Sequence, residues 1–249
     1  MQRYGLALFT IREAMAQNWR KTLEKVADMG YRAVEFAGFG GVDPKELKKA
    51  VEELGLEAPS NHSIGFENLE KDLRYTYEKD AELGVRFCVC PCGKSFTRDE
   101  YLRAAELLNR QGETAKQFGL QLLYHNHARE FTSFDGQYGL DIIFENTDPA
   151  LVQAEIDTYW VAYSGVDTVS YLKKYAGRLP LIHLKDLSIH QGEKIYSELG
   201  EGCLDIPSFL HAAEECGTLY SMVEQDACLR DPMDSISISM SYLRRMEEK

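Results

Sequence analysis

The chain has 249 residues, a hydrophobic content of 44% and a formal net charge of −12, with a sequence pI near 5.0. This acidic balance argues against nucleic acid and against an anionic membrane as partners, because both require a basic protein face. It still permits a local cationic pocket for a sugar phosphate. No apolar run is long enough to span a bilayer, and the N-terminal residues lack the features of a secretory signal. We therefore expect a cytoplasmic protein.

Short apolar runs recur about every thirty residues along the chain, with helical stretches between them. Each run has the length and composition of a buried strand. The expected strands cover residues 4–9, 32–36, 56–60, 85–91, 120–124, 151–156, 179–184 and 219–223. The expected helices cover residues 19–29, 43–55, 69–83, 97–119, 140–145, 167–175, 206 onward and 235–246.

Three of these helix starts carry specific signals in the sequence. Asp43 and Ile206 are each followed by proline, which is favoured in the first turn of a helix. Thr97 and Glu100 form a capping box, in which a hydroxyl and a carboxylate three residues apart bond to the free amides of the helix start.

Eight strands that each precede a helix predict a single (β/α)8 TIM barrel of the α/β class over residues 1–249, a fold that needs about 250 residues. An open doubly wound sheet is the alternative. It would usually carry a glycine-rich turn after the first strand, where this chain has Thr10-Ile-Arg-Glu13. The longest polar connection, residues 188–203, is expected to form a loop over the pocket.

Three cysteines alternate near the fourth expected strand, at Cys88, Cys90 and Cys92. A metal or redox cluster is one interpretation, but zinc sites usually have two residues between paired cysteines. We interpret these residues as buried thiols of an inner strand that ends at Pro91.

Polar residues gather at the expected C-terminal ends of the strands, where a TIM barrel builds its active site. Asp157, His183 and Glu224 end the sixth, seventh and eighth strands. Any one of them alone would be an ordinary strand-end residue in contact with solvent. Three on neighbouring strands can share one ion, and imidazole with carboxylate suits Mn²⁺, Co²⁺, Zn²⁺ or Mg²⁺.

A second polar set, His125, His127 and Glu130, follows the fifth strand. Period-two alternation places the two histidines on one face of the strand. If this face points inward, His125 is the fourth metal ligand and His127 contacts the substrate. Glu130 can act as a second base or reach the metal itself. The alternative is a pair of loop histidines that bond to the backbone.

Other candidates surround these residues. Lys185 shares a face with His183, where its ammonium group can stabilise an enediolate or hold a hydroxyl; a solvated lysine is the alternative. Trp160, three residues after Asp157, can form a wall for sugar stacking or belong to the core. The expected substrate-binding rim at the ends of the first three strands consists of Arg12, Glu35 and His62.

The chain resembles the sugar phosphate isomerase/epimerase family of xylose-isomerase-like TIM barrels, in the AP endonuclease type 2 superfamily. The motifs that carry the resemblance are Gly30-Tyr-Arg-Ala-Val-Glu35-Phe, Tyr-His125-Asn-His127-x-x-Glu130-Phe, Glu-x-Asp157-x-Tyr-Trp160, His183-Leu-Lys185-Asp186, Gly-Glu-Gly202-x-Leu-Asp205 and Val-Glu224-Gln-Asp226.

The resemblance implies one divalent metal ion, held by Glu, Asp, His and Glu from strands five to eight. The last three ligands fall at Asp157, His183 and Glu224, but the first falls at His125, where this chain departs from the family. In ketose epimerases that glutamate is also one of two bases. Here Glu224 is the expected base, and Glu130 is the candidate for the other.

The expected reaction is metal-assisted proton transfer next to the carbonyl of a sugar, keto-sugar or cyclitol, through an enediolate. Return of the proton makes the protein an isomerase or epimerase. Loss of a β-hydroxyl makes it a lyase like the inosose dehydratases. A sugar-binding barrel without catalysis is a further alternative, because of the histidine at position 125. Phosphodiester hydrolysis on damaged DNA is disfavoured by the charge. The resemblance also suggests a homo-oligomer.

Overall fold

The computed structural model describes residues 3–91, 93 and 96–248, and Cys92 lies outside them. Eight parallel strands close into a barrel in the order β1-β2-β3-β4-β5-β8-β9-β12, with β12 pairing back to β1. This confirms the predicted (β/α)8 TIM barrel. The barrel strands are β1 (Arg3–Ala7), β2 (Ala33–Phe36), β3 (Glu57–Asn61), β4 (Phe87–Cys90), β5 (Gln121–His125), β8 (Val152–Asp157), β9 (Leu181–Leu184) and β12 (Tyr220–Val223).

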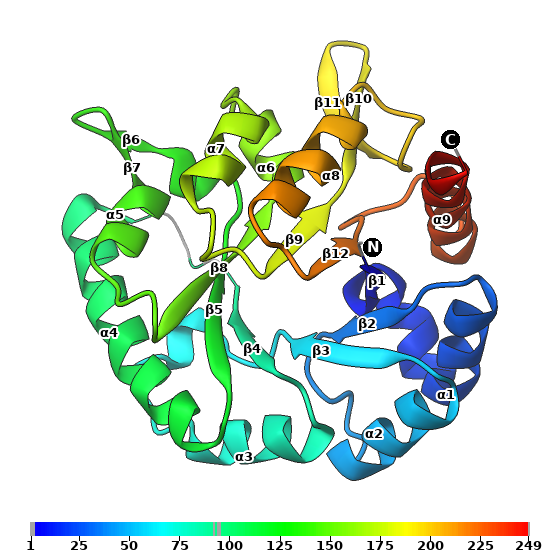
Figure 1. The fold of residues 1–249 in the computed structure, drawn as a ribbon, viewed down its shortest axis with the longest axis horizontal. Helices are drawn as coiled ribbons and strands as arrows, with labels where there is room; N and C mark the ends of the chain where they lie inside the picture. The colour runs from blue at the N-terminus through cyan, green and yellow to red at the C-terminus, as the bar shows by residue number, and fades with distance from the viewer. Residues whose placement is uncertain (1–2, 92, 94–95, 249) are drawn as a thin grey trace.

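The helices form a ring around the strands (Figure 1). They are α1 (Arg12–Asp28), α2 (Pro44–Glu53), α3 (Arg74–Leu83), α4 (Arg98–Gln117), α5 (Gly139–Glu145), α6 (Thr158–Tyr163), α7 (Thr168–Lys174), α8 (Ile206–Glu215) and α9 (Pro232–Glu247). The three predicted helix starts are confirmed: Asp43 caps α2, Thr97 and Glu100 form the capping box of α4, and α8 begins at Ile206. No helix in the described part of the chain is long and apolar enough to cross a membrane.

The first helix begins earlier than its apolar pattern indicates. The expected start was Trp19, but α1 begins at Arg12, directly after a short 3₁₀ turn (Leu8–Ile11). Asn18 has φ −158° and ψ 82°, which are not helical angles and divide α1 into two pieces. The helical spacing starts anew at Trp19, and this is why the sequence pattern indicates only the second piece.

The expected polar loop after β9 contains an antiparallel hairpin, β10 (Asp186–His190) and β11 (Glu193–Ser197). It projects beyond α8 at the top of the view in Figure 1. Its two-residue turn has positive φ at both Gln191 (50°) and Gly192 (87°), as a type I′ turn requires. The first turn residue is glutamine, whereas asparagine or aspartate is usual at this position of a type I′ turn. The sequence therefore gives only a weak signal for the hairpin.

The inward-facing positions of the barrel change from apolar to polar along the strands. A small inner cluster fills the interior with Ala33, Phe87, Val89, Leu123, Leu181 and Met222. Strand side chains alternate between faces, so the residue two positions after each of these faces the same way. Four of these later positions hold Glu35, His125, His183 and Glu224. The barrel interior is therefore apolar at its base and polar at its C-terminal end, where the cavity opens.

Cys88 and Cys90, expected as buried thiols, are indeed buried in β4. Neither belongs to the groups of side chains in the described residues that could hold a metal ion.

The loop that follows the hairpin is fastened by one carboxylate. Asp186, which is 1% exposed, accepts hydrogen bonds from the amides of Leu187, Gly200, Gly202 and Leu204. A Cβ on Gly202 would lie 2.2 Å from Asp186 Oδ1. The close approach explains glycine at this position.

We predict that Asp186→Ala lowers the free energy of unfolding by about 3 kcal/mol, because it leaves four backbone amides, one buried and three partly buried, without their acceptor. Asp205→Ala is a matched control, since Asp205 only caps the exposed start of α8 and its loss should cost about 1 kcal/mol. Urea unfolding of both variants measures the difference. Equal losses would show that the Asp186 contacts do not fasten the loop.

Candidate active site and metal centre

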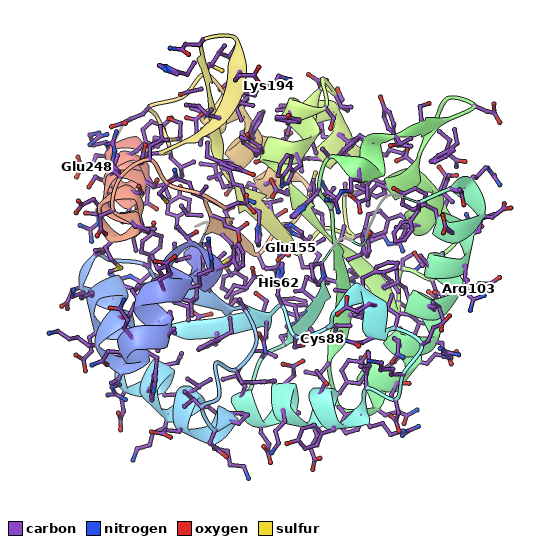
Figure 2. The ribbon with its side chains drawn as sticks, turned by 180° about the vertical axis from the view of Figure 1, so that it is seen from behind. His62, Cys88, Arg103, Glu155, Lys194 and Glu248 are labelled. Carbon is purple, nitrogen blue, oxygen red and sulfur yellow. The ribbon has the colours of Figure 1, made fainter. Side chains whose placement is uncertain are left out.

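A cavity of about 310 Å³ opens at the C-terminal end of the barrel. It is lined by Ala7, Phe9, Glu35, Phe36, Ala37, His62, Pro91, His125, His127, Glu224 and Asp226. Figure 2 shows His62 and Glu155 pointing toward one another near the middle of the barrel, whereas Arg103 and Lys194 lie at its outside. The cavity floor is therefore made of imidazole and carboxylate groups from different strands.

The first group of polar side chains, called the histidine–glutamate cluster, consists of His62, His125, Glu155 and His183. Glu155 Oε2 lies 2.7 Å from His62 Nε2, 3.0 Å from His125 Nδ1 and 3.5 Å from His183 Nε2. The ligand atoms of the four residues all lie within 4.8 Å of one another. Three imidazole nitrogens thus converge on one carboxylate oxygen.

Glu35 and Ser60 adjoin this cluster. Glu35 Oε1 lies 2.7 Å from His183 Nε2 and 3.1 Å from His62 Nε2. Ser60 donates a hydrogen bond of 2.7 Å to the other oxygen of Glu35 and fixes the direction of the carboxylate. Glu35 and His62, expected at the rim, therefore lie in the floor of the cavity.

The second group, called the lysine–carboxylate cluster, consists of Asp157, Lys185, Glu224 and Asp226. Lys185 Nζ lies 2.8 Å from Asp157 Oδ2, 2.6 Å from Glu224 Oε2 and 2.7 Å from Asp226 Oδ2. Lys185 is fully buried. Its contact with Asp157 is an ion pair rather than a well-directed hydrogen bond. An ammonium group thus stands among three carboxylates, two of which were expected to bind the metal.

His183 contacts both groups through its two ring nitrogens, and with Asp157 and Glu224 it forms a second set of side chains that could hold a metal ion. Its Nδ1 lies 2.8 Å from Glu224 Oε2, and its Nε2 faces Glu35 and Glu155. The structure therefore brings together His125, Asp157, His183 and Glu224 as expected, but distributes them over two adjoining groups. His125 Nε2 is 3.8 Å from Asp157 Oδ2.

Asp157 also starts a helix that the sequence analysis did not anticipate. Its Oδ1 accepts hydrogen bonds from the amides of Tyr159 and Trp160 and caps α6. Asn126 Oδ1 accepts a hydrogen bond from the amide of Asp157. Both contacts fix the end of β8, and with it the direction of the Asp157 carboxylate.

The charges of the floor perturb the pKa values of its groups. Burial lowers the pKa of His62, but Glu35 and Glu155 outweigh it and raise this pKa to about 10. Burial raises the pKa of Glu155, but the surrounding histidines outweigh it and lower this pKa to about 2. Burial raises the pKa of Asp157 to about 6, against the opposing charge of Lys185. The floor therefore keeps Glu155 ionised and places positive charge beside it.

Glu130 is a buried residue whose carboxylate faces its own loop. Its two oxygens accept hydrogen bonds from the Tyr124 hydroxyl at 2.8 Å and from the His127 amide at 2.9 Å. It is not among the residues that line the cavity. These contacts fix the loop that carries His127, and the role of Glu130 as a second base stays a prediction.

The remaining candidates lie around the opening. His127 lines the cavity, and the ring of Trp160 lies behind it at a centroid distance of 5.2 Å. Arg12 does not line this cavity: its guanidinium group covers the Phe9 ring at 4.5 Å and donates to the Phe9 carbonyl. Arg12 thus holds a cavity residue without facing the cavity.

Glu155 is the central residue that the sequence analysis missed. It stands two positions before Asp157, in Glu-Ile-Asp, so strand alternation places both carboxylates on the same face. That period-two spacing was the available signal. The sequence-based prediction includes only Asp157, the acid at the end of this strand.

The closed barrel and the imidazole–carboxylate floor define a (β/α)8 barrel with a polar site at the C-terminal ends of its strands. A family model described as xylose isomerase-like TIM barrel matches residues 23–246, and the chain belongs to this family.

Individual relatives show what the chain is similar to. An inosose dehydratase from Geobacillus kaustophilus (strain HTA426) is 27% identical, with 91% of this chain and 86% of that protein covered. The structure of a sugar phosphate isomerase/epimerase from Parabacteroides distasonis is 28% identical, covers 98% of this chain and 93% of that one, and superposes with a TM-score of 0.82. A structure of the IOLI protein with a bound zinc atom shares the fold at 14% identity, with a TM-score of 0.77. The match covers 99% of this chain and 97% of that one.

We predict that Glu130 makes stability depend on pH. Burial raises its pKa to about 7, from an ordinary value of 4.5. The folded state therefore binds this proton more tightly than the unfolded state, and the stabilisation is lost as the pH rises from 4.5 toward 7. Relative to Glu130→Gln, the free energy of unfolding of the unmodified protein should decrease across this window. Urea unfolding at a series of pH values, with exposed Glu106→Gln as the control, measures it. A difference between the two proteins that does not change with pH would contradict the assignment.

Proposed function

We propose that the protein removes a proton from the carbon next to a carbonyl group of a keto-sugar or cyclitol, with the help of one divalent metal ion. The observation that carries this proposal is the Glu224 carboxylate. It lines the cavity and is held from behind by the Lys185 ammonium and the His183 ring. A carboxylate fixed in this way is a suitable general base for a carbon acid bound in the cavity.

The residues of the floor fit a divalent metal ion. Three imidazoles and several carboxylates converge there, and the buried Oε1 atom of Glu155 has no hydrogen-bond partner. A buried carboxylate oxygen without a partner is unfavourable unless a cation satisfies it. When bound, such an ion would polarise the carbonyl group and stabilise the negative charge that develops on its oxygen. The zinc atom of the IOLI structure belongs to that protein, and support for a metal here comes from the donor set itself.

The other residues position the reacting groups. Lys185 is fully buried and forms ion pairs with three carboxylates, so we assign it the role of holding Glu224 and keeping it ionised. Positive charge beside Glu224 lowers its pKa well below the usual range, against the effect of burial. His127, backed by the Trp160 ring, offers a flat polar surface for a sugar ring.

Two outcomes can follow proton removal, and the arrangement favours the loss of water. An epimerase needs groups that exchange a proton on both faces of the carbon. The family glutamate at position 125 is a histidine here, and Glu130 is bonded within its own loop. In dehydration the C–H electron pair forms a double bond and the proton goes to Glu224. The β C–O bond breaks with its electron pair on oxygen, and the hydroxyl leaves as water with the proton that Glu224 returns. The inosose dehydratase relative supports this outcome.

Epimerisation or isomerisation is the second candidate function. The likeness to a sugar phosphate isomerase/epimerase over 98% of this chain supports it. His127 lines the same cavity, and burial together with Lys185 lowers its pKa to about 4, which keeps the ring neutral and able to accept a proton. A neutral imidazole that lines the same cavity as Glu224 would supply the second base.

We predict deuterium uptake next to the carbonyl when the protein is supplied with Mn²⁺, Co²⁺ or Zn²⁺ and a panel of keto-sugars and inososes in D₂O. An unsaturated ketone that absorbs in the ultraviolet should accumulate with it. Glu224→Gln should slow both by at least ~100-fold, because an amide cannot accept the proton. Glu214→Gln, on the exposed surface of α8, is the matched control. Epimers without water loss would assign the second function. No exchange with any substrate would contradict both and favour a binding barrel.

A further inference from the structure

We propose that the metal ion of this protein binds in the histidine–glutamate cluster, on the Nε2 side of His183, and not between Asp157 and Glu224, where the Lys185 ammonium stands. This inference rests on the proposed need for one divalent ion and specifies where that ion lies. It replaces two of the four ligands expected from the family resemblance, Asp157 and Glu224, by His62 and Glu155.

The first argument is the position of Lys185. Its Nζ lies 2.8 Å from Asp157 Oδ2 and 2.6 Å from Glu224 Oε2, and the same Glu224 oxygen lies 2.8 Å from His183 Nδ1. The other oxygen of Asp157 accepts two amide hydrogen bonds at the start of α6. A metal ion held by these two carboxylates would be in direct contact with a buried ammonium group, and like charges repel strongly away from water.

The second argument is the tautomer of His183. The Nδ1 atom lies 2.8 Å from Glu224 Oε2, and the Nε2 atom faces Glu35 and Glu155. With a metal ion at Nε2, the ring would keep its hydrogen on Nδ1 and donate it to Glu224. Histidine ligands commonly donate a hydrogen bond from the N–H of their second ring nitrogen to a carboxylate. This bond fixes the ring and makes it a better ligand. Glu224 thus supports the metal site from the outer shell while it faces the cavity as the base.

The third argument is the completeness of the donor set. His62 Nε2, His125 Nδ1 and His183 Nε2 surround Glu155 Oε2, and the four ligand atoms lie within 4.8 Å of one another. The second oxygen of Glu155 is buried and has no hydrogen-bond partner. Four donors around one ion with bonds of about 2 Å require such a convergence. Glu35 Oε1, 2.7 Å from His183 Nε2, is available as a fifth donor.

The site is open on one side and selects a class of metal. His62 and His125 line the cavity, so a substrate oxygen can reach an ion that they hold. Metal sites that keep an open position are typical of catalysis. Three imidazoles with one carboxylate suit Zn²⁺, Co²⁺ or Fe²⁺ better than Mg²⁺, which prefers oxygen ligands.

The test is Co²⁺ binding, measured by the visible absorption of the bound ion and by competition with a chromophoric chelator. Glu155→Gln and His62→Gln should each weaken Co²⁺ binding by at least ~100-fold, because each removes a ligand. Glu224→Gln should change it by less than ~10-fold, because the amide oxygen still accepts from His183. His211→Gln, an exposed histidine of α8, is the matched control. Far-UV circular dichroism establishes folding, and the half-buried position of His62 gives a second variant if Glu155→Gln fails to fold.

The outcomes separate the placement of the metal from the proposed function. Weakened binding in the Glu155 and His62 variants, with binding retained in Glu224→Gln, supports the placement. Binding lost in Glu224→Gln and retained in both Glu155→Gln and His62→Gln overturns it and returns the ion to the Asp157–Glu224 position, while the proposed reaction stands. Failure of the unmodified protein to bind Co²⁺ or Zn²⁺ overturns the placement, and proton exchange in D₂O then shows separately whether the reaction survives.

Discussion

The burial of the Lys185 ammonium among three carboxylates is the interaction on which the site depends. A buried charge is costly unless its partners compensate it closely, and removal of one partner from such a group typically costs about 3–5 kcal/mol. Lys185 contacts acids from the ends of β8 and β12, so it ties these strands to β9. The same contacts hold Glu224 in place. The contacts that compensate the buried charge of Lys185 are therefore the same contacts that fix the position of the Glu224 carboxylate.

Two successive residues at the junction between β9 and β10 have different roles, one in the site and one in its support. Lys185 faces the carboxylates of the floor, whereas Asp186 holds the loop through four backbone amides. Asp157 combines both tasks, since one oxygen caps α6 and the other faces the ammonium. Because strand side chains alternate, one short segment can serve the cavity on one face and the surrounding loops on the other.

The fold was predictable because its signals are local. Apolar runs, helix caps and the spacing of strands and helices lie within short segments of sequence. The start of α1 was misplaced because Asn18 interrupts the helical spacing, and the hairpin was missed because Gln191-Gly192 is an uncommon turn pair. The division of the site into two groups depends on the two nitrogens of His183, whose directions follow from strand register and ring rotation. No local pattern contains that information.

The pairing of β5 with β8 explains how the site can have a histidine at position 125 instead of a glutamate. In the register of these strands, His125 lies directly beside Glu155. A carboxylate expected at the end of β5 is thus supplied by the neighbouring strand, within 3.0 Å of the imidazole that stands in its place. The floor thus keeps a negative charge, carried by Glu155 and in contact with His62. Histidine in place of glutamate at position 125 would weaken a metal site made of carboxylates. Here it is consistent with an imidazole-rich site, because the neighbouring Glu155 provides the negative charge.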